Sequence, residues 1–380
     1  MSALDVDLLL RDATVVVCCG SGGVGKTTVA AALGLEAARL GRRAVVVTID
    51  PARRLADALG VPGGLGNDPV RLDTAAIGGD AAGELWALML DTATTFDGLV
   101  RAQATDTEQA ERILGNAFYR NIAGSLSGTQ EYMAAERLHA LHLDDRFDLV
   151  VVDTPPSRNA LDFLDAPGTL SRFLDHPVFR LMMLPARRGL KVLNIASQPL
   201  LRAVGKVVGG EVLADAVAFF QAFAGMETGF RTRADEVHRL VHSDGTRFVL
   251  VASPREDTID EARYFAGRLA ASGLAVSAVV VNRCTPLFDA PSGARPAGAV
   301  GAALFDNLTE LHATALTERA QAAALLADDP GDAGDAGDAA TASPTPAAGS
   351  VFVATLAGDV HDLPTLDLVR RALVDRPDTT

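Results

Sequence analysis

The chain has 380 residues, 48% of them hydrophobic, which is enough for the core of one large α/β domain with an inserted subdomain. Acidic residues outnumber basic ones by 48 to 34, and the resulting net charge of −14 argues against the extended basic surface typical of nucleic-acid-binding proteins. An N-terminus that is acidic where a signal peptide is basic, and the lack of any apolar run of roughly 18 residues, predict a cytoplasmic protein without a membrane span.

The first predicted elements are a strand, a glycine-rich turn and a helix. Residues 14–19 (TVVVCC) are apolar and β-branched, as expected of a buried strand. Residues 26–40 are rich in alanine and end before Gly41, which predicts a helix and its stop. A second apolar run, residues 44–49 (AVVVTI), predicts the next strand. This order of elements is that of a βαβ unit and predicts a parallel sheet.

Four further apolar runs predict additional strands of the same sheet, at residues 147–152, 248–252, 276–281 and 351–354. Helical patterns lie between them. We therefore expect an α/β fold with a doubly wound, mostly parallel sheet and an inserted helical subdomain.

The predicted domain organisation follows from two segments that interrupt this alternation. Helices and loops are expected at residues 82–145, and the helical insertion at residues 168–243. A segment rich in Asp, Gly, Ala and Pro lacks any apolar period and is expected to be disordered. The predicted parts are a first part of the core (1–167), the insertion (168–243), a second part of the core (244–327), the disordered loop (328–350) and a C-terminal strand and helix (351–380).

The insertion carries Met- and Phe-rich faces, for which two interpretations are open. Met182 and Met183 follow one amphipathic helical pattern, and Phe219, Phe220 and Phe223 lie on another. Such faces commonly pack inside the protein as core. Alternatively, they form an apolar surface for a hydrophobic client.

The glycine-rich turn has the sequence of a nucleotide-binding P-loop. Residues 20–27 read GSGGVGKT and match G-x-x-x-x-G-K-[ST], between a predicted strand and a predicted helix. In such a loop, backbone N–H groups and the helix N-terminus face the phosphates. Lys26 is expected to reach the β- and γ-phosphate oxygens, and the Thr27 hydroxyl to bind Mg²⁺. The predicted nucleotide-binding residues are Gly20, Ser21, Gly22, Gly23, Val24, Gly25, Lys26, Thr27 and Thr28.

Carboxylates follow two of the predicted strands. Asp50 stands in TIDPAR and Asp153 in DTPP, each directly after an apolar run. The carboxyl ends of parallel strands meet at the edge of the sheet where the P-loop lies. We expect Asp153 to hold the metal directly or through water. Asp50 is expected to hold a metal-bound water or to orient the attacking water, the alternative being a plain Asp-Pro turn.

These motifs resemble those of the arsenite-pump and tail-anchored-protein-targeting ATPases, a deviant-Walker family related to the nitrogenase iron protein and the Min and Par ATPases. GSGGVGKTT, TIDPARRLADALG and DTPPSRNALDFLDAP are similar to the P-loop, switch I and switch II of that family. Asn282 in VVVNR resembles its adenine-reading Asn, and residues 354–363 resemble the loop that closes over the base. The resemblance implies an ATP- and Mg²⁺-dependent dimer whose hydrolysis moves helical subdomains.

Three departures from the family pattern bear on activity and assembly. Ser21 stands where the family usually has Lys, and Arg53 and Asn159 stand where it has switch histidines. No C-x-x-C pair is present, since the cysteines are Cys18, Cys19 and Cys284, and the two adjacent ones are expected to be small buried hydrophobes. The departures leave hydrolysis by the chain alone open and imply no zinc-bridged homodimer.

Two hypotheses of function follow. The first is an ATPase switch that couples hydrolysis to a subdomain binding a hydrophobic protein client or a membrane partner. The alternative is a catalytically weak nucleotide-binding scaffold, paired as a heterodimer with a paralogous ATPase that carries the signature Lys. A DNA-partitioning ATPase is disfavoured by the net charge, and an iron–sulfur reductase by the cysteines. Three cysteines also make an arsenite-binding thiolate cluster unconvincing.

Overall fold

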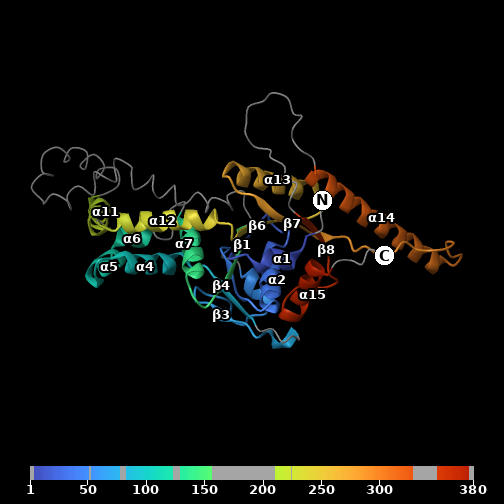
Figure 1. The fold of residues 1–380 in the computed structure, drawn as a ribbon, viewed down its shortest axis with the longest axis horizontal. Coiled ribbons are helices and arrows are strands. Elements are labelled where there is room, and N and C mark those ends of the chain that lie inside the picture. Colours follow the sequence, from blue (N-terminus) through green and yellow to red (C-terminus); the bar gives the residue numbers. More distant parts are fainter. Residues whose placement is uncertain are drawn as a thin grey trace, which may run out of the picture. The chain divides into compact units, whose positions relative to one another are not determined.

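The structure, a computed structural model, falls into two compact units along the chain (Figure 1). It describes residues 4–50, 53–77, 83–122, 129–155, 210–223, 225–327 and 349–375. The first unit comprises residues 1–89, 141–161 and 242–380, and the second comprises residues 90–140 and 162–241.

The first unit is built on an eight-stranded sheet in the order β3-β4-β2-β5-β1-β6-β7-β8. The strands are β1 (Val15–Cys19), β2 (Arg43–Thr48), β3 (Val70–Arg71), β4 (Glu84–Met89), β5 (Leu149–Asp153), β6 (Thr246–Ala252), β7 (Val276–Cys284) and β8 (Gly349–Ala354). Neighbouring strands pair in parallel, except for the antiparallel pair β3–β4. The predicted α/β fold with a mostly parallel sheet is thus confirmed. β1 lies between β5 and β6, where the strand order reverses and where ligands of such sheets bind.

Helices cover both faces of this sheet (Figure 1). They are α1 (Val6–Arg11), α2 (Lys26–Arg39), α3 (Arg54–Leu59), the 3₁₀ helix η1 (Thr74–Ile77), α13 (Glu256–Ala271), α14 (Ala299–Ala327) and α15 (Leu363–Val374). One apolar cluster joins α1, α2 and α15 to the sheet, and it includes Leu10, Leu33, Leu366, Val16, Val46 and Val151. Alternate residues of each central strand face this layer, and the residues between them face the helices on the other side of the sheet. Because both faces are covered, the strands are continuous apolar runs in the sequence.

A buried ionic cluster fixes α15 against α2. Arg370 Nη1 donates a hydrogen bond of 2.6 Å to Glu36 Oε2, and Arg370 Nε donates one of 2.5 Å to Asp367 Oδ1. The three side chains are at most 7% exposed. α15 begins with a capping box between Asp362 and Thr365, so the loop before it ends at a defined point.

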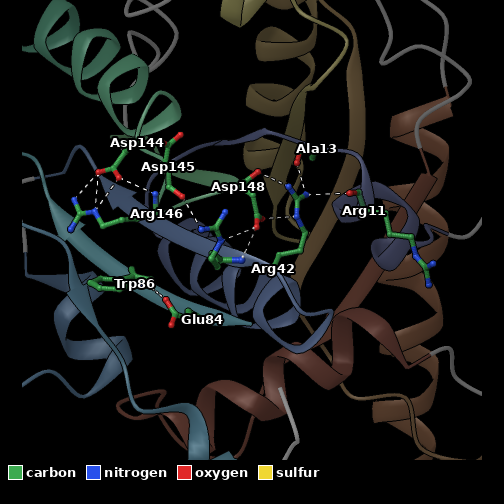
Figure 2. Close-up of polar contacts among 10 residues, drawn as sticks. Arg11, Ala13, Arg42, Glu84, Trp86, Asp144, Asp145, Arg146 and Asp148 are labelled. Atoms are coloured by element: carbon green, nitrogen blue, oxygen red, sulfur yellow. Dashed lines mark hydrogen bonds and ion pairs between the residues drawn. The ribbon is translucent and has the colours of Figure 1, made fainter. Parts of the chain in front are cut away.

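A second polar network lies at the N-terminal ends of the parallel strands β1, β2 and β5 (Figure 2). Arg42 precedes β2, and its guanidinium donates hydrogen bonds to the carbonyl oxygens of Leu10, Arg11 and Ala13. Its Nε also donates to Asp148 Oδ1 at 2.9 Å, directly before β5. One side chain thereby satisfies backbone carbonyls at the end of α1 and in the loop before β1, together with a carboxylate directly before β5.

Two expectations about element boundaries are wrong. β4 lies in segment 82–145, for which helices and loops are expected. Its sequence ELWALM sets half-buried Glu84 and Trp86 against a buried opposite face, so it lacks the long apolar run of the central strands. β8 begins at Gly349, inside the loop expected at 328–350, because residues 349 and 350 pair with β7. Residues 328–348 lie outside the described residues.

The second unit is helical. It contains α4 (Thr92–Gln103), α5 (Thr107–Leu114), α6 (Ala117–Ile122), most of α7 (Thr129–His142), α11 (Gly210–Phe223) and α12 (Glu227–Val241). Residues 90–140 thus group with the insertion, whereas the predicted organisation assigns them to the first part of the core. Residues 156–209, which include Asn159, Met182 and Met183, lie outside the described residues.

An aromatic core explains this grouping. Phe219, Phe220 and Phe223 of α11 are between 5% and 8% exposed and pack in one cluster with residues of α4, α5 and α6. The rings of Phe223 and Phe230 are 4.9 Å apart. These three phenylalanines therefore form core, as the first of the two interpretations holds. Among the helices described in either unit, none combines the length and apolarity needed to cross a bilayer.

Candidate nucleotide-binding site

The glycine-rich turn after β1 has a backbone that only glycine tolerates at two points. Gly20 has φ +152°, and a Cβ there would lie 2.1 Å from the carbonyl oxygen of Val251 in β6. Gly25 has φ +93°, and its Cβ would lie 2.3 Å from Asn282 Nδ2 in β7. The loop is therefore drawn tightly against the neighbouring strands before α2 begins at Lys26.

Lys26 turns back over this loop. Its Nζ donates a hydrogen bond of 2.7 Å to the carbonyl oxygen of Ser21, and the residue is 6% exposed. Burial lowers the pKa of Lys26, while the carboxylate of Asp153 acts in the opposite direction. The hydroxyl of Ser21 is itself buried and has no hydrogen-bond partner among the described residues.

Asp153, at the end of β5, accepts hydrogen bonds from two hydroxyl groups. Thr27 Oγ1 and Thr48 Oγ1 both donate to its Oδ2, at 2.8 and 2.9 Å. The strand register explains this, since Asp153 pairs with Thr48 on β2 and with Cys18 on β1. Burial raises the pKa of Asp153 to about 6, although the two hydroxyls act against that rise. Its Oδ1 is buried without a hydrogen-bond partner in the described parts of the chain.

Asp50 lies just beyond the end of β2. Its backbone N–H donates to Thr48 Oγ1 at 3.3 Å, which links it to the group around Asp153. Its carboxylate Oδ2 accepts a hydrogen bond of 3.1 Å from Arg54 Nη1. The residue is 9% exposed. Pro51 and Ala52, which follow it, lie outside the described residues.

Two adjoining cavities open beside these groups. The smaller, of about 390 Å³, is lined by Gly23, Gly25, Lys26, Thr27, Thr28, Asp50, Arg54, Asp57, Ala58, Thr154, Arg283 and Val360. The larger, of about 670 Å³, is lined mainly by Asn282, Arg283 and residues 353–360. They share Gly25, Thr28, Arg283 and Val360. Both volumes fall in the range of small-molecule sites.

Asn282 belongs to β7 and contacts the P-loop. It is 8% exposed, and its Nδ2 donates a hydrogen bond of 2.8 Å to the carbonyl oxygen of Val24. Part of its amide thus supports the loop. The next residue, Arg283, has φ +62° at a register shift between β7 and β8, and it lines both cavities.

The structure therefore brings most of the predicted site residues together. Lys26, Thr27 and Asp50 line the smaller cavity, and Asp153 lies directly behind Thr27. Sequence reasoning missed Thr48, Arg54 and Arg283. A polar residue closing an apolar strand is a usable signal for Thr48, whereas the backbone strain at Arg283 has no sequence signature.

The oxygens present fit a magnesium ion. Mg²⁺ is usually held by one or two protein oxygens together with waters and substrate phosphates, not by an all-protein cage. Thr27 and Asp153 supply a hydroxyl and a carboxylate, and the buried Asp153 Oδ1 is available for a further contact. Within the described ranges, no group of three or more His, Cys, Asp or Glu residues is arranged to hold a metal.

The chain is similar to known proteins over about 70% of its length. The chain is 31% identical over 272 residues to an uncharacterized protein of Streptomyces coelicolor, covering 70% of this chain and 61% of that one. It is 27% identical over 273 residues to the arsenical pump-driving ATPase of Escherichia coli, covering 70% and 39%. The chain thus spans less than two thirds of both relatives. With ATPase GET3 of Podospora anserina it shares 27% identity over 266 residues, covering 70% and 71%.

A family model described as anion-transporting ATPase matches residues 13–292, a stretch that includes β1, the P-loop, Asp50, Asp153 and Asn282. This match covers more than half of the chain and most of the strands of the sheet. The chain belongs to the anion-transporting ATPase family.

Proposed function

We propose that the protein binds Mg²⁺-ATP in the two adjoining cavities and hydrolyses it. The observation that carries this proposal is the group formed by Thr27, Thr48 and Asp153, with a buried, unpartnered carboxylate oxygen beside Lys26. A buried carboxylate with one oxygen left without a hydrogen bond is stabilised further by a cation. The P-loop then supplies the anion site next to it.

Each part of the site has a role in binding. Backbone N–H groups of residues 20–28 and the Lys26 ammonium hold the phosphates, and Thr27 and Asp153 hold Mg²⁺. When bound, the ion neutralises charge that develops on the phosphate oxygens. The nucleoside occupies the larger cavity, whose walls include Asn282 and residues 353–360.

Asp50 acts on the water. The water oxygen forms a bond to the γ-phosphorus while the bond from that phosphorus to the β–γ bridging oxygen breaks, and ADP leaves with that oxygen and its electron pair. Asp50 accepts a hydrogen bond from the water and takes up its proton, so the products are ADP, inorganic phosphate and a proton.

Hydrolysis is coupled to the helical unit and its client or partner. Residues 143–148 join α7 to β5, which ends at Asp153, and residues 242–245 join α12 to β6. A change of contacts at Asp153 can therefore bias helices of the second unit through short covalent links. Identical hydrogen exchange of α11 and α12 in ATP-bound and ADP-bound protein would contradict this coupling.

A second candidate function is favoured by Ser21. Its side chain is short, neutral and buried, so a cation at this position is missing from the chain. As one subunit of a heterodimer, the protein would bind nucleotide, and a lysine of the paralogous partner would complete the site. The chain alone would then hydrolyse ATP only weakly.

The test of nucleotide binding is calorimetric titration of ATP into the full chain with Mg²⁺. The parent should bind, and Lys26→Ala should not, because it loses the charge facing the phosphates. Arg255→Ala is the matched control, since Arg255 is 73% exposed and pairs with nearby Asp257, away from the residues that line the cavities. A folded parent protein that binds no Mg²⁺-ATP refutes the proposed function.

A further inference from the structure

Arg54 lines the smaller cavity together with two other cationic residues, Lys26 and Arg283. Arg54 is the first residue of α3. Its Nη1 lies 3.1 Å from Asp50 Oδ2, and its side chain is 58% exposed. Arg53 is also exposed, but it is not among the described residues that line this cavity.

Arg54 can exchange its ion pair with Asp50 for a contact with a phosphate group. An ion pair with one well-hydrated partner contributes little to stability, because solvent screens it and two long side chains must be ordered. A bound triphosphate offers several negative oxygens, and the planar guanidinium fork matches two of them at once. The balance therefore favours phosphate over Asp50 when both are within reach.

We propose that Arg54 binds the terminal phosphate of a nucleoside triphosphate and, in doing so, releases Asp50 to orient the attacking water. This inference rests on the proposed function and adds a residue to the same site. Without a terminal phosphate, Arg54 stays on Asp50 and occupies the oxygen that the water needs. With one, the same guanidinium neutralises charge on the transferred phosphoryl group.

Two consequences separate Arg54 from the general positive charge of the cavity. First, it discriminates between triphosphate and diphosphate, whereas Lys26 serves both. Second, charge alone is not sufficient, because a lysine lacks the planar fork that engages two oxygens. Arg54 is therefore a specificity-determining residue for binding as well as a group that acts on the reacting phosphate.

The experiment compares Arg54→Gln, Arg54→Lys and Arg53→Gln in the full chain. Dissociation constants with Mg²⁺ are measured for a non-hydrolysable ATP analogue and for ADP, and phosphate release is measured separately. Arg54→Gln should weaken the analogue about 10-fold or more and leave ADP unchanged. Its turnover should fall by about 10³-fold. Arg54→Lys should lie between, and Arg53→Gln should match the parent.

Two results overturn the inference. One is an equal loss of affinity for the analogue and for ADP in Arg54→Gln, which would show a general electrostatic effect. The other is unchanged preference and turnover in Arg54→Gln. In both cases Lys26-dependent binding by the parent would stand, so the proposed function survives. A parent chain that binds neither nucleotide refutes both.

Discussion

Thr27 Oγ1 donates a hydrogen bond of 2.8 Å to Asp153 Oδ2, although 126 positions separate the two residues in the chain. Thr27 lies in the first turn of α2 and Asp153 ends β5, so the bond joins the P-loop helix to the strand beside β1. In the proposed complex these two side chains would hold Mg²⁺. The bond therefore brings the two groups together without the ion.

Removal of the Thr27 hydroxyl should weaken the effect of Mg²⁺ on nucleotide binding. Thr27→Ala loses one of the two protein ligands of Mg²⁺ and keeps Asp153, so Mg²⁺ should raise its affinity for ATP much less than it raises that of the parent. Thr27→Ser keeps the hydroxyl and should retain most of the effect. Titration of all three proteins with and without Mg²⁺ checks this, and full Mg²⁺ dependence in Thr27→Ala would show that Thr27 is not a ligand.

Asp50 should be needed for turnover but not for nucleotide binding, whereas Lys26 should be needed for both. Asp50→Asn removes the group that orients the water, so it should bind ATP nearly as the parent does and hydrolyse it roughly 10²–10⁴-fold more slowly. Lys26→Ala should lose binding and activity together. Both are measured by titration and phosphate release, with any required partner present. Parent-like turnover by Asp50→Asn would mean that its assigned role is wrong.

Asp153 should make the nucleotide-free protein less stable as pH rises. Its pKa is raised by burial to about 6, from an ordinary value near 4, so the folded state binds the proton more tightly than the unfolded state. This contribution is full below pH 4 and is lost as pH rises through 6. The parent should lose about 1 kcal/mol more than Asp153→Asn between pH 5 and pH 7.

The measurement for Asp153 is urea unfolding of parent and variant at both pH values, without Mg²⁺ or nucleotide. The amide of the variant does not titrate, so the difference between the two proteins isolates this carboxyl. Equal pH dependence of both proteins would contradict the raised pKa.

Arg42 should matter for stability and not for nucleotide binding (Figure 2). Arg42→Ala leaves carbonyl oxygens at the end of α1 and before β1 without this donor, and Asp148 with Arg43 alone, so the free energy of unfolding should fall by about 2 kcal/mol. The exposed Arg255→Ala should change it by no more than about 0.5 kcal/mol. Urea unfolding checks both, and a loss of ATP affinity in folded Arg42→Ala would contradict a purely structural role.

Ser21 decides between the two candidate functions. If a paralogous subunit supplies the missing cation, turnover of the chain alone should be low and should rise by about 10³-fold when that subunit is added. Ser21→Lys should raise the activity of the chain alone if a homodimer forms. Fast hydrolysis by a pure homodimer, unaffected by Ser21→Lys, would exclude the heterodimer and indicate that an Arg of this chain, with Arg54 as the candidate, replaces the missing lysine.

The local parts of the site could be predicted from the sequence, because local motifs encode them. The glycines, Lys26 and Thr27 belong to one continuous loop between a strand and a helix, and Asp153 follows an apolar run that could only be a central strand. Parallel pairing then fixes which strand ends meet. This is why the contact between Thr27 and Asp153 was predictable in outline.

The remaining parts depend on contacts that no local pattern encodes. The pairing of β4 with β2 turns a mixed sequence into a strand, and the aromatic cluster around Phe219 gathers residues 90–140 with α11. The position of Arg54 depends on how α3 starts after Asp50. The strain at Arg283 arises where β7 and β8 change register. In each case tertiary contacts override the local preference.

The bond between Arg370 and Glu36 has an evolutionary consequence. Arg370 also pairs with buried Asp367, so losing Arg370 alone leaves two buried carboxylates, Glu36 and Asp367, without that cation, at a cost of about 3–5 kcal/mol. Position 370 should therefore keep its positive charge in relatives in which positions 36 and 367 are acidic. Glu36 lies on the helix that begins with Lys26. A substitution at position 370 is therefore expected to disturb the nucleotide-binding site at the other end of that helix.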